Sequence, residues 1–215
     1  MKVSPFDRRM WPFLITGFGM YLGLTVALMT VGFLLQDRMH LTVGETGRAS
    51  GLVLLAAAGM VVIVQAVVVP RLGWPPARFM RLGTALMTLG ALVTAIAPNQ
   101  PLLAVGFAVL GTGLGFGLPG VMAAPTLLAT REEQGAVAGL VSAGTALTFV
   151  VGPIVGSGLY EIAPTLPYAL VTVLLSALTI FTFVHPAVRQ TSAVAANGAP
   201  DPGTVEEPRP ANTPT

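Results

Sequence analysis

The chain has 215 residues, of which 53% are apolar and 9% are charged. Because a soluble domain carries about 25% charged residues, this composition excludes an ordinary soluble protein. The chain has no cysteine, which excludes a disulfide framework, a thiolate nucleophile and a cysteine-ligated metal. The net charge is +2, and no basic run indicates a nucleic-acid partner.

Long uncharged stretches divide the sequence into six candidate membrane spans. A helix needs about 20 apolar residues to cross the hydrocarbon core of a bilayer, and charged or turn residues separate stretches of that length. The predicted spans are residues 11–35, 49–69, 80–97, 102–124, 135–160 and 167–184. They predict an all-α membrane protein whose transmembrane domain covers residues 11–186, with the lipid bilayer as its surroundings.

The two ends of the chain differ from the spans. Residues 1–10 precede the first span, which is too long for the apolar region of a signal peptide and therefore predicts a retained helix. The stretch after Arg189 has five prolines and no aromatic residue, so residues 187–215 predict a disordered tail. With the N-terminus inside, only Arg38 and Arg48 of the 11 Lys and Arg residues lie outside. This bias predicts that both termini are cytoplasmic, in a cell membrane (inner or plasma).

Glycine and proline interrupt the fourth and fifth spans. In lipid, small residues let helix backbones approach closely, and a proline inside a helix frees a carbonyl and bends the helix. We therefore expect helix packing and bending at a set of small residues in these two spans: Gly111, Gly115, Pro119, Gly139, Gly152, Pro153 and Gly156.

The sequence gives little support for an enzyme. Residues 115–120 satisfy G-x-G-x-x-G, but no strand precedes them and Pro119 lies inside the motif, which argues against nucleotide binding. His40 and His185 lie at or beyond the ends of spans, so a serine within a span has no general base. No His, Cys or carboxylate cluster has metal-ligand spacing. The sequence predicts no enzyme, no cofactor and no metal site.

The fifth span and two loops carry a family resemblance. Gly139, Thr148, Gly152, Pro153, Gly156 and Ser157 approximate the antiporter motif G-x8-G-x3-G-P-x2-G-G. In the loop over residues 70–78, Arg71 and Gly73 match the motif G-x-x-x-D-R-x-G-R, with Pro70 at the acidic position, and residues 131–140 resemble the usual entry to the eleventh helix. The chain resembles the C-terminal six-helix half of a major facilitator superfamily transporter of the drug:proton antiporter type.

The resemblance implies two inverted three-helix repeats and solute transport by alternating access. It also implies that the first, second, fourth and fifth spans line a cavity and that the third and sixth face lipid. The candidate cavity residues on the lining spans are Tyr21, Thr25, Gln65, Met122, Thr145 and Phe149. For Gln65, a cavity hydrogen bond and a bond between helices remain equal alternatives.

The resemblance covers one half of a twelve-helix transporter, so a missing N-terminal six-helix half is an expected partner beside a small-molecule solute. Apart from Arg81 at the start of the third span, the spans contain no Asp, Glu, Lys, Arg or His, so a proton carrier would belong to that half. A fragment, a split half and a homodimer of six-helix chains all remain open. The alternative function is a six-helix membrane protein without transport activity, acting in assembly or regulation.

Overall fold

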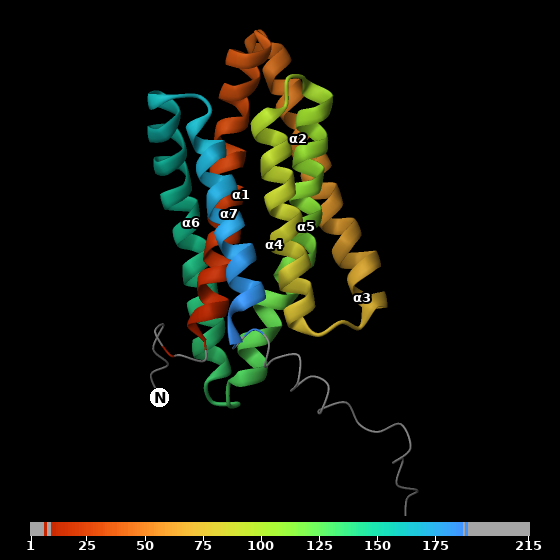
Figure 1. The fold of residues 1–215 in the computed structure, drawn as a ribbon, viewed down its shortest axis with the longest axis vertical. Coiled ribbons are helices and arrows are strands. Elements are labelled where there is room, and N and C mark those ends of the chain that lie inside the picture. The colour runs from red at the N-terminus through yellow and green to blue at the C-terminus, as the bar shows by residue number, and fades with distance from the viewer. Residues whose placement is uncertain (1–6, 8–9, 187, 189–215) are drawn as a thin grey trace, which may run out of the picture.

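The computed structural model describes residue 7, residues 10–186 and residue 188. These residues form the helices α1 (Trp11–Met39), α2 (Val43–Ile63), η1 (Val64–Val68), α3 (Val69–Leu72), α4 (Pro76–Ile96), α5 (Gln100–Leu128), α6 (Gln134–Ile162) and α7 (Leu166–Val184) (Figure 1). Six helices are long and apolar enough to cross a membrane, with α2, η1 and α3 counted as one. The predicted all-α, six-helix membrane fold is confirmed. Nearly all of the predicted tail lies outside the described residues.

Two helices begin earlier than the apolar stretches that predicted them, because polar residues cap their N-terminal ends. Thr42 accepts from the Glu45 N–H, and the Glu45 carboxylate accepts from the Thr42 N–H at 2.9 Å, so α2 begins before the first apolar run. Asn99 Oδ1 accepts from the Leu102 N–H at 3.0 Å and starts α5. Polar caps, and not the loss of hydrophobicity, therefore set these helix ends.

The rod formed by α2, η1 and α3 contains a π-helical segment immediately before Pro70. The Val69 N–H bonds to the Val64 carbonyl five residues earlier. A proline ring clashes with the carbonyl four residues before it, and the wider π turn keeps the helix continuous past that point. The rod ends at Gly73, which has a positive φ of 54° and forms a left-handed C-cap.

The helices form two groups of three, α1–α2–α4 and α5–α6–α7, whose members make corresponding contacts. Helices α1 and α5 pack together at the centre, α6 packs on α1, and α2 packs on α5. Helix α4 packs on α5, α7 packs on α1, and α4 and α7 pack on each other. In Figure 1, α4 and α7 cover the near face, while α6 and the α2–α3 rod form the two sides. Exchanging the two groups maps each of these contacts onto another of them, as the predicted pair of three-helix repeats requires. The contact between α6 and α7 has no equally extensive counterpart between α2 and α4.

Two kinds of contact hold α4 in place. Its glycines meet α5, because a Cβ at Gly83 would lie 2.5 Å from the Gly117 Cα, which places the two backbones in direct contact. Hydroxyl pairs join α4 to α7, with Thr88 Oγ1 3.0 Å from Thr179 Oγ1. Helix α4 therefore fixes the orientation of α5 relative to α7.

Candidate functional site

Helices α1 and α6 are joined from their middle to the end of the bundle where Asp37 lies, called here the Asp37 end. The Thr25 hydroxyl donates to the Thr148 carbonyl at 3.2 Å, and Gly152 lies against Thr25 with no room for a Cβ. At the last turn, the Tyr160 hydroxyl donates to Asp37 Oδ2 at 2.7 Å. The pair is thus closed over this half of its length.

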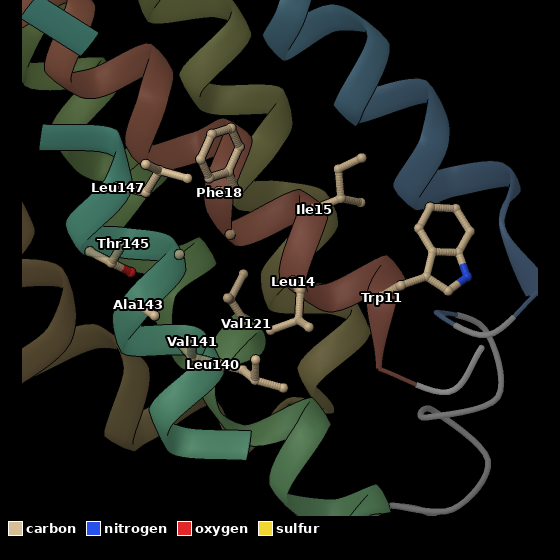
Figure 2. A pocket seen from close by; sticks show the side chains of 12 residues that line it. Trp11, Leu14, Ile15, Phe18, Val121, Leu140, Val141, Ala143, Thr145 and Leu147 are labelled. Atoms are coloured by element: carbon tan, nitrogen blue, oxygen red, sulfur yellow. The ribbon is translucent and has the colours of Figure 1, made fainter. Parts of the chain in front are cut away.

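Toward the opposite end, called the Trp11 end, α1 and α6 separate and leave a groove of about 690 Å³. Side chains from α1, α5 and α6 form this α1–α6 groove, and Figure 2 shows Leu14, Val121 and Leu140 converging on it from the three helices. The groove is lined by Trp11, Leu14, Ile15, Gly17, Phe18, Val121, Leu140, Val141, Ala143, Gly144, Thr145 and Leu147. None of these residues carries a charge.

Thr145 supplies the one hydroxyl of the groove lining. Most threonines of this bundle donate to the carbonyl four residues earlier, as Thr16 does to Pro12 at 2.7 Å and Thr30 does to Val26 at 2.8 Å. Within the described part of the chain, the Thr145 hydroxyl forms no such bond. It is therefore available to a molecule in the groove.

A smaller hollow of about 370 Å³ lies between the α2–α3 rod and α5, also toward the Trp11 end. Gln65, on the π-helical segment, lines it together with Val69, Leu118, Pro119 and Met122. Among the described residues, the Gln65 amide has no hydrogen bond to another helix. Of the two alternatives left open for Gln65, this geometry favours the amide facing a cavity.

The six predicted cavity residues do not form one site. Thr145 lines the α1–α6 groove, whereas Gln65 and Met122 line the smaller hollow. Thr25 is buried and its hydroxyl donates to carbonyls. Tyr21 and Phe149 line neither hollow, and the Phe149 side chain is 54% exposed.

The predicted packing glycines differ in their surroundings. A Cβ at Gly111 would collide with the Ala57 carbonyl oxygen, one at Gly115 would lie 2.9 Å from Val64, and one at Gly156 would lie 3.2 Å from Thr30. Gly152 meets Thr25 as described above, whereas a Cβ at Gly139 meets nothing within 4 Å in the described part of the chain. Pro119 and Pro153 lie inside α5 and α6.

The predicted loop motif caps its own helix. The Arg71 guanidinium donates to the Val67 carbonyl at 2.5 Å within the same rod, and Gly73 supplies the left-handed turn. Most of the groove lining, including Leu14, Phe18 and Val121, was not anticipated, because ordinary apolar residues line a hollow only where two helices separate. No local pattern in the sequence indicates that separation.

Comparison with known proteins identifies the family. The model of the Major Facilitator Superfamily matches residues 13–210. The MFS-type transporter TOXA of Cochliobolus carbonum is 34% identical over 76 residues. That match covers 35% of this chain and 14% of the relative, so the matched segment is a small part of that protein's length. With its six apolar helices, this chain belongs to the Major Facilitator Superfamily and is a multi-pass membrane protein.

Proposed function

We propose that this chain is the C-terminal half of a transporter, of the drug:proton antiporter type, that moves a small solute by alternating access together with a second six-helix half. The family match supports membrane transport, and one structural observation supports the need for a second half. That observation is the uneven distribution of glycine contacts between the central and the flanking helices.

Glycines on the central side of the bundle contact other helices, whereas those on α2 and α6 are largely uncovered. A Cβ built at any glycine of α4 or α5 meets another helix within 4 Å. On α2 and α6, by contrast, a Cβ meets nothing within 4 Å of the described chain at Gly44, Gly47, Gly51, Gly59, Gly135, Gly139, Gly144 and Gly158. Small residues at a membrane helix surface allow another helix to approach closely. The uncovered faces of α2 and α6 therefore suit further helices.

The faces of α4 and α7 differ from those of α2 and α6 because they carry no uncovered glycine in the described structure, which suits lipid. Their exposed residues are large and apolar, with Leu92 at 45%, Val173 at 67% and Ile180 at 65% exposure. Helix α7 contains no glycine. This contrast supports the expectation that the third and sixth spans face the bilayer while α2 and α6 meet the missing half.

The positions of the charges support a proposed orientation of the chain and a proposed place for the proton carrier. Helix α3, the start of α4 and the connection between α5 and α6 lie toward the Trp11 end (Figure 1). They carry Arg71, Arg78 and Arg131, so under the positive-inside rule this is the cytoplasmic end of a cell-membrane protein. Both hollows then open toward the cytoplasm, as a carrier needs when it loads a solute for export. No carboxylate lies in the middle of any helix that the structure describes. We therefore place the proton carrier in the second half.

The test begins with the DNA upstream of the Met1 codon, where six further apolar spans are expected. Co-expression of both segments should give efflux of ethidium or Nile red from energised cells, and a protonophore should abolish it. We expect Gly51→Leu and Gly139→Leu to prevent pairing of the segments, measured by co-purification. The control Leu92→Phe, on the lipid-facing side, should leave pairing intact.

Three results would contradict the proposal. Efflux from this chain alone would show that it works as an assembly of identical copies. Pairing that survives both glycine substitutions would show that α2 and α6 do not meet the second half. An upstream region without membrane spans would favour the alternative of a six-helix membrane protein without transport activity.

A further inference from the structure

We propose that the α1–α6 groove binds an uncharged, largely apolar solute with one hydrogen-bond acceptor, and that the Thr145 hydroxyl donates to that acceptor. The proposal rests on the proposed function in so far as a transporter must bind a solute. It is nevertheless tested by binding to this chain alone. A failure of solute binding by this chain would therefore leave the proposed transport by two halves unaffected, and the reverse also holds.

The shape of the groove follows from the contact between α1 and α6. The helices are tied at Thr25 and Thr148 and, toward the Trp11 end, leave about 690 Å³ between them. Ligand pockets commonly have volumes of about 300 to 1,000 Å³. The tie closes the groove at its inner end, so a solute enters from the Trp11 end or from the side.

The residues that line the groove determine which solute charge it can accept. Leu14, Phe18, Val121 and Leu140 present hydrocarbon, and no lining residue carries a charge. A charged group that loses its water here would find no counter-ion, which costs far more than the apolar contacts return. The groove therefore selects against cations and anions alike.

The hydroxyl of Thr145 favours a solute that carries a hydrogen-bond acceptor. Thr145 belongs to a lining that is otherwise apolar, and no described residue forms a hydrogen bond with its hydroxyl. Thr145 is half-buried, and a solute that covers its hydroxyl without bonding to it would leave that group unsatisfied, which is unfavourable. A carbonyl or ether oxygen on the solute would satisfy it. A hydrocarbon of the same shape would leave it unsatisfied.

The two tryptophans allow a direct binding measurement. Trp11 lines the groove, whereas Trp74 packs in a separate apolar cluster with Phe79. The variant Trp74→Phe leaves Trp11 as the only fluorophore of its kind. In phosphatidylcholine nanodiscs, it is titrated with para-bromobenzophenone and with para-bromodiphenylmethane, which has the same rings but no carbonyl oxygen.

We expect both compounds to quench Trp11 saturably, with the ketone binding more tightly. Thr145→Val should raise the Kd of the ketone about three- to tenfold, the value of one hydrogen bond, without changing that of the hydrocarbon. The matched control Thr112→Val removes a hydroxyl that donates to the Ala108 carbonyl at 2.8 Å and should change neither Kd.

Three results would overturn the proposal. Non-saturable quenching, with the same concentration dependence for Trp74 in a Trp11→Phe variant, would show partition into lipid only. Equal affinity for ketone and hydrocarbon in the unsubstituted groove would remove the role of the acceptor. An equal effect of Thr145→Val on both compounds would show that the substitution changes packing and not a hydrogen bond.

Discussion

Tyr160 on α6 donates a hydrogen bond to Asp37 on α1, with 2.7 Å between the hydroxyl oxygen and Oδ2. Its ring also lies against Phe33, one turn earlier on α1, with the ring centroids 5.4 Å apart. One side chain thus joins the last turns of two helices that separate at their other ends. This contact keeps the Asp37 end of the pair closed while the α1–α6 groove is open.

Replacing Tyr160 by Phe should loosen this end without removing the ring contact. The lost bond to an exposed carboxylate should cost about 1 kcal/mol of unfolding free energy, measured by dodecyl sulfate titration of the micelle-bound protein. The chain has no cysteine, so Val155→Cys gives one reporter thiol on α6, and its maleimide labelling should become faster in the Tyr160→Phe background. An unchanged labelling rate would mean that the hydroxyl does not hold the two helices together.

A second tyrosine provides the matched control. Tyr168 is 1% exposed, and its hydroxyl lies near the Thr30 side chain but forms no hydrogen bond of normal geometry in the described structure. Because an unsatisfied buried hydroxyl is unfavourable, Tyr168→Phe should leave the unfolding free energy unchanged or raise it by about 1 kcal/mol in the same titration. A clear loss of stability would reveal a bound water or another partner for this hydroxyl.

Arg38 should stabilise the end of α4. One guanidinium nitrogen donates to the carbonyls of Ala95 and Ala97 at 3.0 and 3.1 Å, where a helix end leaves carbonyls without partners. Arg38→Met should lower the unfolding free energy by about 1 to 2 kcal/mol and speed amide hydrogen exchange in the last turn of α4. The control Arg48→Met removes an exposed charge of the same size and should do neither. Equal effects of the two variants would attribute the stabilisation to charge alone.

The sequence predicted the fold well because bilayer thickness constrains helix length so strongly. Stretches without charge were enough to find the six helices. Their ends were harder to predict, because Thr42 and Glu45 extend α2 beyond its apolar stretch. The π-helical segment before Pro70 was not predicted, since a proline in a sequence indicates only that a hydrogen bond is missing.

The candidate site was predicted less completely. Thr145 and Gln65 were singled out as polar groups in apolar helices, and each lines a hollow. Thr25 has the same sequence signature but donates to a carbonyl across the helix contact. Sequence pattern shows that a hydroxyl lies in a span. Whether that hydroxyl donates to a backbone carbonyl or faces an open groove depends on how α1 packs against α6.

Two glycines with the same sequence signature should respond oppositely to a methyl group. At Gly111 the added Cβ would collide with the Ala57 carbonyl, so Gly111→Ala should force α2 from α5 and cost about 1 to 3 kcal/mol of unfolding free energy. At Gly139 the Cβ meets no described atom within 4 Å, so Gly139→Ala should be neutral or stabilising by up to about 1 kcal/mol through its higher helix propensity. Equal losses in dodecyl sulfate titrations of the isolated chain would mean that α6 packs differently. If Gly139 contacts the second half, the alanine variant should lose stability only when both halves are present, which separates packing within the chain from packing between halves.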